Sequence, residues 1–169
     1  ETRSYEHEFQ VQSQEVKFDI TGYPLAGHKV GFGGNAILHS LNQGVLNPLN
    51  DLSLIIPIDF GQESGLEYAV HAYDEINLTD QLTFSGGLRY SFFNYLDTTQ
   101  HYSGLEPRAS LNYVLSPNTS IKASYNRMRQ HLFMLSNTVA ISPTDRWKLT
   151  DPYIRPPVSD QISIGVYKN

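Results

Sequence analysis

The sequence predicts an all-β fold, namely an antiparallel transmembrane β-barrel segment of about seven strands. Apolar and polar residues alternate along long stretches, which is typical of strands with one apolar and one polar face. Each stretch runs for roughly a dozen residues, whereas soluble strands usually end near ~5–6 and a tilted strand needs about 9–11 to cross a bilayer. The connections also alternate between short turns and long loops, as they do in transmembrane barrels.

The expected strands follow one another along the whole chain. In the central pair, 66–78 and 82–95, the even positions are apolar and the odd positions are mostly polar. We expect the following order: strand 4–20, tight turn 22–28, strand 30–38, long loop 42–63, strands 66–78 and 82–95, medium loop 96–104, strand 105–115, tight turn 116–119, a strand from 121, long loop 132–157, and strand 161–168.

The first strand departs from simple alternation. Val11 is apolar at an odd position, whereas Val16, Phe18 and Ile20 are apolar at even positions. This change of parity predicts either a β-bulge around Ser13–Gln14 or a segment that rises out of the membrane.

Aromatic residues fall at two heights along the expected strands. The two heights are roughly ten residues apart, which projects to about 26 Å along a barrel axis and matches the ~25 Å apolar band between aromatic girdles. Near the short turns are Tyr23 and Tyr113, and far from them are Tyr68, Tyr90, Phe92 and Tyr95.

The parity of the central hairpin constrains its turn at 79–81. Opposed residues of an antiparallel pair share a face, and the apolar positions are even on both sides of the turn. The two sequence numbers of each opposed pair must therefore add up to an even value, and we expect this value to be 160. This register predicts a three-residue loop with Leu78 opposite Leu82, excludes a two-residue loop, and predicts a left-handed or bulged residue near Asp80.

Two further expectations concern pairing. The same count predicts a five-residue loop over 116–120 with Leu115 opposite Ile121. Strands 4–20 and 161–168 are expected not to pair with each other, each being an edge of an incomplete barrel. Unpaired edges in lipid cost several kcal/mol per backbone group, so we expect the chain to be an interior part of a longer polypeptide.

Composition and motifs exclude several functions. Twelve basic and 17 acidic residues give a net charge of −5, which argues against a nucleic-acid surface, and the absence of cysteine argues against a disulfide-stapled module. Six dispersed histidines lack metal-ligand spacing, so we expect no metal and no cofactor. Glu67 and Glu75 lie ~27 Å apart along a strand, too far for paired acid–base catalysis. With no nucleophile constellation either, we expect no enzymatic activity.

The polar parity of the central strands carries a group of charges. In a barrel these side chains would face the upper lumen, and the candidates are Glu67, His71, Arg89, Glu106 and Arg108. We expect a salt-bridge lattice that ties strands together or holds a plug, with substrate contact as the alternative.

The opposite parity is expected to face lipid. Val70, Leu88, Leu111 and Ile164 have this parity. Arg127 also has it, although an arginine at mid-depth on the lipid face costs ~2–4 kcal/mol. Either a bulge near Asn126 turns Arg127 inward, or the parity assigned to this strand is wrong.

Two loops carry candidates for contact with a ligand or partner. The segment from Leu52 to Ile58 is very apolar, so we expect it to pack on other loops, with a surface lipoprotein lid as the alternative partner. In the last long loop, Arg146, Trp147 and Tyr153 are candidates for stacking a sugar or siderophore, with a role as loop anchor as the alternative.

Three segments resemble the barrel of TonB-dependent outer-membrane receptors. EYAVHAYDEINLTDQLTFSGGLRYSFF (67–93) resembles the strand–turn–strand unit that such barrels repeat. So does LEPRASLNYVLSPNTSIKASYNRMRQHLFMLSN (105–137), with its Glu-Pro-Arg opening and Ser-Pro-Asn turn. TDRWKLTDPYIRPPVSDQISIG (144–165) is similar to the family's next loop and strand. The resemblance covers most of the chain from about residue 8 onward.

The resemblance implies a 22-stranded barrel in the bacterial outer membrane, with an N-terminal plug. Such a receptor imports a scarce nutrient, such as siderophore-bound iron, haem, a glycan or a peptide, with energy passed on by TonB. Its partners would be membrane lipid, TonB, the plug and the nutrient, and no nucleic acid. Residues 1–169 depart from the family in having no plug domain, no TonB-contacting box and only about a third of the strands.

Two alternatives from other classes remain open. One is a small passive outer-membrane pore or adhesin, which the odd number of strands disfavours because complete bacterial barrels have an even number. The other is a soluble lectin-like β-sandwich that binds glycan through its long loops. A sandwich would bury Val70 and Leu111 between two sheets.

Overall fold

The computed structural model describes residues 5–50, 54, 56–135 and 146–168. Most of them form one antiparallel sheet with the spatial order β12-β9-β8-β7-β6-β3-β2. No helix in the described part of the chain is long and apolar enough to cross a membrane. The strands of the sheet are β2 (Gln10–Gly22), β3 (His28–Asn42), β6 (Gln62–Asn77), β7 (Leu82–Tyr95), β8 (His101–Ser116), β9 (Thr119–Arg129) and β12 (Val158–Lys168).

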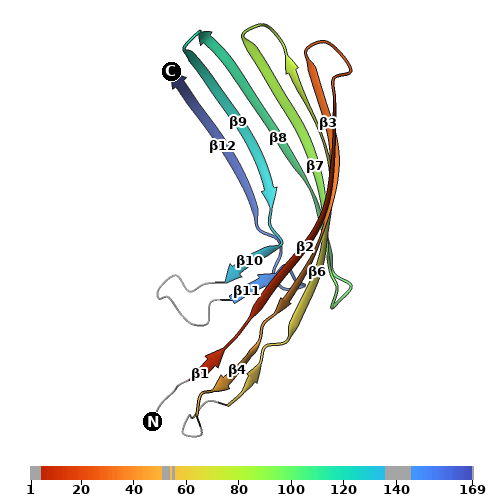
Figure 1. Cartoon of the computed structure of the whole chain (residues 1–169), viewed down its shortest axis with the longest axis vertical. Coiled ribbons are helices and arrows are strands. Elements are labelled where there is room, and N and C mark those ends of the chain that lie inside the picture. The colour runs from red at the N-terminus through yellow and green to blue at the C-terminus, as the bar shows by residue number, and fades with distance from the viewer. Residues whose placement is uncertain (1–4, 51–53, 55, 136–145, 169) are drawn as a thin grey trace.

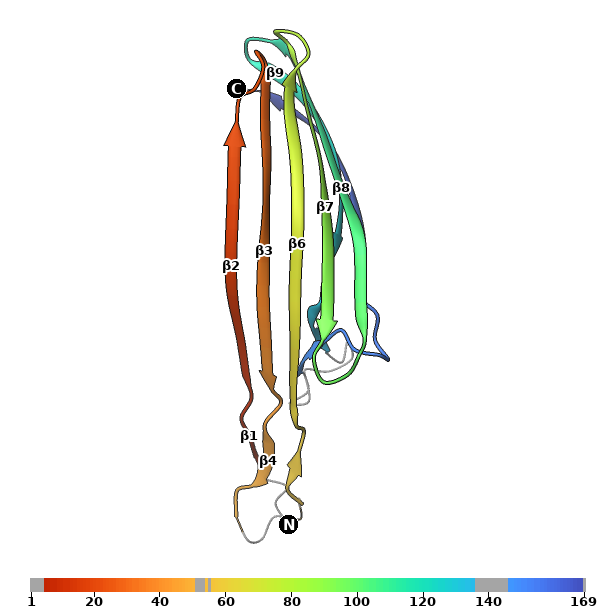
Figure 2. The ribbon, with the colours of Figure 1, turned by 90° about the vertical axis from the view of Figure 1, so that its right-hand side faces the viewer.

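The turns β2–β3, β6–β7 and β8–β9 lie at one end of the sheet, and the long connections β3–β6 and β9–β12 lie at the other (Figure 1). The β7–β8 connection, expected to be a medium loop over 96–104, also lies at this second end but spans only residues 96–100. Additional short strands extend this second end; one precedes β2, and the others belong to the two long connections. In the described residues these are β1 (Tyr5–His7), β4 (Val45–Pro48) and β5 (Ile58–Asp59), which form a three-stranded sheet, and the hairpin β10 (Leu132–Leu135) and β11 (Arg146–Leu149). Figure 2 shows β6 and β3 running on toward the small sheet, well beyond the end of β7.

The central hairpin has the expected register. Tyr68 pairs with Phe92 and Val70 with Tyr90, so the sum of 160 is confirmed. The first strand is more regular than expected, because β2 pairs with β3 without any shift and has no bulge around Ser13–Gln14. The chain is instead interrupted between β1 and β2, at the end of the long connections.

The turn after β6 preserves parity by an unexpected geometry. Thr79 and Leu82 exchange two backbone hydrogen bonds, so only two residues lie at the tip. Leu78 also donates to the Leu82 carbonyl, and Leu78 and Thr79 therefore face Leu82 together, as in a bulge. The exclusion of a two-residue loop is thus wrong, because the bulge supplies the odd residue.

No left-handed residue is needed at this turn. Of the two conformations expected near Asp80, the bulge is present at Leu78–Thr79, whereas no non-glycine residue among the described ones has a positive φ. The Thr79 hydroxyl accepts hydrogen bonds from the backbone N–H groups of Gln81 and Leu82 and holds the turn instead.

The turn between β8 and β9 is also shorter than expected. Ser116 pairs with Thr119, which leaves a two-residue tip where five loop residues were expected. A bulge just before Ser116 absorbs the odd residue. Ile121 therefore lies opposite Tyr113 and not opposite Leu115, but the assignment of residues to faces is unchanged.

The two faces of the sheet differ as the alternation predicts. The side chains expected to face lipid are between 40% and 78% exposed, which excludes burial between two sheets and with it the sandwich. We call their side of the sheet the apolar face; it carries Val70, Leu88, Leu111 and Ile164. The opposite side, which carries His71, Arg89 and Arg108, is the polar face.

Tyr68, Tyr90 and Phe92 form an aromatic cluster on the apolar face. The rings of Tyr68 and Phe92 stack at 5.0 Å, and Tyr90 meets Phe92 edge-on at 4.5 Å. Tyr95, which was grouped with them by height, lies instead on the polar face, where it packs on the core described below. Tyr113 is 40% exposed on the apolar face, nearer the short turns.

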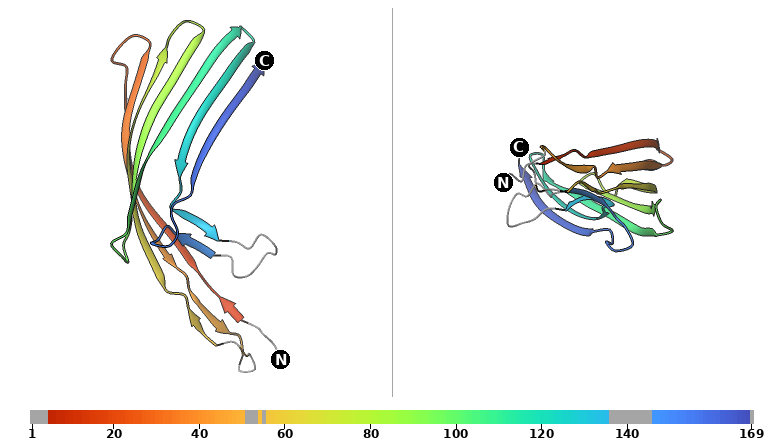
Figure 3. Two further views of the ribbon diagram at one scale, coloured as in Figure 1. Left: turned by 180° about the vertical axis from the view of Figure 1, so that it is seen from behind. Right: turned by 90° about the horizontal axis from the view of Figure 1, so that it is seen from below.

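The polar face is concave. Figure 3 shows the strands arranged along an arc, and residues from six strands, β2 to β9, line one cavity of about 490 Å³ on this face. Gly31 allows the ring of Tyr73 to lie flat against the wall, since a Cβ at Gly31 would come within 2.3 Å of that ring.

The sheet is open. β2 and β12 are its two edges, and no backbone ladder joins them, as expected for an incomplete barrel.

The two faces predict losses of different size when a new charge is placed on neighbouring residues of β8. Leu111→Lys places a cation on the apolar face and should lower the free energy of unfolding by about 2–4 kcal/mol in a bilayer. Ser110→Lys, one residue away on the polar face, should cost less than about 1 kcal/mol. Urea unfolding of the full-length protein in lipid vesicles measures both, and equal losses would contradict the assignment of faces.

Candidate functional site

Arg89 is the centre of an ion-pair network on the polar face. It projects from the middle of β7, directly opposite His71 on β6 and Glu106 on β8. Its Nη2 donates to Glu67 Oε1 at 3.3 Å, and its Nε lies 3.8 Å from Glu106 Oε2. Glu106 is only 4% exposed and accepts a further hydrogen bond from the Ser91 hydroxyl.

The network continues to β3 through His39. His39 Nε2 lies 3.8 Å from Glu67 Oε2, and the other ring nitrogen of His39 is 2.9 Å from the Ser13 hydroxyl on β2. Side chains of five neighbouring strands, from β2 to β8, are thereby joined. The structure thus brings Glu67, Arg89 and Glu106 together as a lattice.

The hairpin β10–β11 docks on the polar face beside this lattice, on the side nearer the long connections. Lys148 donates to Glu63 at the start of β6 and pairs with Asp151 at 2.9 Å. Burial alone would lower the pKa of Lys148, but its hydrogen bonds to the two carboxylates outweigh burial and raise that pKa. Two further bonds, from Gln43 to the Trp147 carbonyl and from Tyr102 to the Asp151 carbonyl, hold the same segment.

A small apolar core lies beneath the docked hairpin. Leu41, Phe93 and Leu149 are buried there, from β3, β7 and β11 respectively. His131 stacks on Phe93 with ring centroids 4.5 Å apart, and neither of its ring nitrogens has a hydrogen-bond partner among the described residues. Burial lowers the pKa of His131 to about 4, although the nearby Glu67 opposes the shift.

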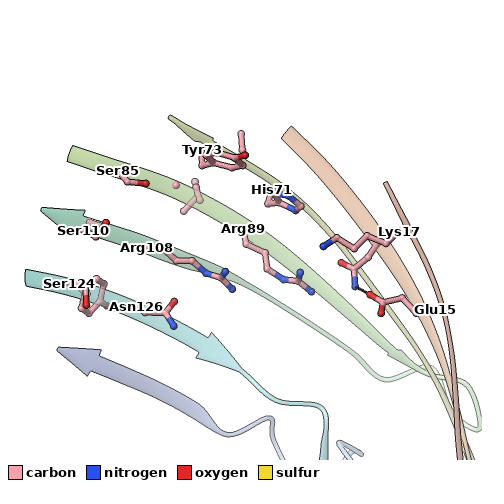
Figure 4. Close-up of a pocket in the computed structure, with 16 residues that line it drawn as sticks. Glu15, Lys17, His71, Tyr73, Ser85, Arg89, Arg108, Ser110, Ser124 and Asn126 are labelled. Carbon is pink, nitrogen blue, oxygen red and sulfur yellow. Dashed lines mark hydrogen bonds between the residues drawn. The ribbon is translucent and has the colours of Figure 1, made fainter. Parts of the chain in front are cut away.

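On the side of the lattice nearer the short turns, the polar face opens into the cavity shown in Figure 4. His71 is paired there with Asp19 of β2 at 2.9 Å, and Asp19 also pairs with Lys17 at 3.0 Å. Arg108 projects into the same cavity from β8, is exposed, and has no ion-pair partner within the described ranges.

The three loop candidates do not form one group. Trp147 is half-buried against the apolar core, which favours the anchor interpretation. Arg146 is exposed, with its guanidinium 5.9 Å from the ring of Phe60, and Tyr153 is 93% exposed. Contact of Arg146 and Tyr153 with a ligand stays a prediction.

Part of the apolar loop 52–58 lies outside the described residues, namely Leu52, Ser53 and Ile55. Leu54 and Ile56 are 67% and 78% exposed. The segment was expected to pack on other loops, but these two side chains do not pack on any described loop.

Arg127 lies on the apolar face after all. The pairing of β9 is regular through Asn126, so neither a bulge nor a wrong parity is involved. Its guanidinium makes two hydrogen bonds, of 2.7 and 2.9 Å, with Asp160 directly opposite on β12, and Tyr125 donates to the same carboxylate. The charge is thus neutralised by a neighbour that shares its face.

Sequence reasoning missed several members of the site. Glu63 and His39 have the same parity as Glu67 and could have been found by extending the alternation beyond the expected strand ends. Lys148 carried no such signal, because its contact with Glu63 joins residues 85 apart in sequence. No group of three or more His, Asp or Glu side chains in the described part of the chain is placed to hold a metal ion.

The long strands, the exposed apolar face and the concave polar face together define a wall of a transmembrane β-barrel. A family model described as TonB dependent receptor-like, beta-barrel matches residues 2–167. The chain belongs to this family, whose barrels serve transport and reception in the outer membrane of Gram-negative bacteria. A comparison with curated proteins gave no match.

The lattice predicts that two arginines on the same face differ in their effect on stability. Arg89→Met should lower the free energy of unfolding by about 3–5 kcal/mol, because it leaves Glu67 and Glu106 without their shared cation. Arg108→Met removes an exposed, unpaired charge and should change the free energy of unfolding by about 0.5 kcal/mol or less. Urea unfolding of the full-length protein in vesicles tests this, and similar losses in both variants would speak against the lattice.

Docking of the hairpin should weaken in acid. Because the pKa of His131 is about 4 when it is docked and near 6.5 when it is free, the undocked form takes up a proton first as the pH falls. The free energy that favours the docked hairpin should therefore fall by up to about 3 kcal/mol between pH 6.5 and 4, and it should not change above pH 6.5. Emission of Trp147, the single tryptophan of the chain, reports undocking. His131→Phe retains a stacked ring, and an unchanged acid response in this variant would contradict the assignment to His131.

Proposed function

We propose that the chain forms part of the wall of an outer-membrane importer that takes up a scarce nutrient with energy delivered by TonB. The candidate cargoes are siderophore-bound iron, haem, a glycan or a peptide. Membership of the TonB-dependent receptor-like barrel family supports this proposal. A plug domain and TonB are the partners it requires, and membrane lipid would cover the apolar face.

The observation that carries the proposal is the docked hairpin β10–β11. Lys148, Trp147 and Leu149 hold it against the polar face, across the end where the long connections lie. A hairpin held inside the curve of the wall occupies part of the space that an open passive pore would leave free, which favours a receptor that binds its cargo. The lattice beside it supplies a rigid support, because buried ion pairs with several partners fix side-chain positions.

A transport assay distinguishes the importer from a passive pore. Cells that express the full-length protein should accumulate one labelled nutrient among the candidate classes, and deletion of TonB should abolish that accumulation. The matched control is the same strain without the receptor. Uptake that persists at the same rate without TonB would support the passive pore and contradict the importer.

A further inference from the structure

Arg108 differs from the other basic side chains that line the cavity of the polar face. Lys17 and His71 pair with Asp19, and Arg89 pairs with two carboxylates. Arg108 is exposed and has no counter-ion in the parts of the chain that the structure describes. Figure 4 shows its guanidinium extending over the wall from β8, on the same side as that of Arg89.

The charge of Arg108 is not compensated from across the cavity. Glu15 is the one carboxylate among the cavity's described lining residues, and it accepts a hydrogen bond from Asn35. It belongs to β2, which is four strand spacings from β8, or about 19 Å along the sheet. Glu75 of β6 lies opposite Ser85, outside this cavity, and pairs with no cation of the cavity lining. Arg108 is therefore the one basic side chain of the cavity lining without an ion-pair partner among the described residues.

The surroundings of Arg108 are rich in hydrogen-bond donors and leave space for a ligand. Asn126 lies directly opposite Arg108 on β9. In the next row on the same face, Ser85, Ser110 and Ser124 lie directly opposite one another on three neighbouring strands. Rows on one face are about 7 Å apart, within reach of an arginine side chain and a small ligand. Serine hydroxyls and a guanidinium can together donate to the oxygens of one anion.

We propose that this part of the polar face binds an anionic group, a carboxylate or phosphate, carried by the transported solute. Arg108 makes the main contact, and the hydroxyls of Ser85, Ser110 and Ser124 donate hydrogen bonds. The cavity of about 490 Å³ has room for a small solute around that group. The assignment of the anion to the solute rests on the proposed function, whereas the anion site itself does not.

The site can be tested on the isolated full-length protein in detergent, with inorganic phosphate as the probe. Isothermal titration at low salt should show binding to the wild type, and Arg108→Gln should raise the Kd at least about tenfold. Arg155→Gln is the matched control, because it removes the same charge from an exposed arginine between β11 and β12, outside this cavity. It should leave the Kd within about twofold. Absence of binding to the wild type, or equal weakening in both variants, would overturn the proposal.

A chemical measurement on the wild type keeps the test decisive even if Arg108→Gln does not fold. Phenylglyoxal should modify Arg108, and phosphate should protect it, as mass spectrometry of the digested protein would show. Arg127, which is paired with Asp160, serves as the internal reference and should respond equally with and without phosphate. An Arg108 that is unreactive even without phosphate would mean that a carboxylate of the protein itself occupies the site, and would overturn the proposal.

The two proposals fail separately. Uptake that is independent of TonB would remove the importer but leave phosphate binding at Arg108 intact. Uptake that requires TonB, together with an Arg108→Gln variant that binds phosphate as the wild type does, would remove only the anion site.

Discussion

The alternation of side chains along a strand is the constraint on which the rest of this structure depends. A shift of one residue at any ladder would exchange the apolar and polar faces of a whole strand. The chain avoids that shift at two turns by placing a bulge beside a two-residue tip, at Leu78–Thr79 and just before Ser116. Turn length and bulge therefore act together, and neither alone determines which side chains meet lipid.

The polar face is organised by how its charges are shared. Arg89 lies between two carboxylates, and Asp19 lies between Lys17 and His71, so each of these two central charges has two partners. Such sharing compensates for the cost of removing charges from water and ties neighbouring strands to one another. The same principle operates on the apolar face, where Asp160 neutralises Arg127.

The sequence predicted the seven long strands, their faces and the central register, because these features follow from a period of two. It did not predict the turn geometry at Thr79, since a hydroxyl that holds a right-handed turn leaves no mark on the alternation. It placed Glu67, Arg89 and Glu106 on one face, but their distances depend on side-chain conformations. The docking of Lys148 on Glu63 was not predictable, because a contact between residues so distant in the chain depends on the path of the whole loop.

The recess at Gly31 bears on the bore of a channel built from such walls. Because Tyr73 lies flat over this glycine, an aromatic ring adds little to the thickness of the wall at that height. A larger residue at the same position would lift the ring toward the axis and narrow the passage. The lack of a side chain at Gly31 therefore leaves room for a wider solute to pass this level of the wall.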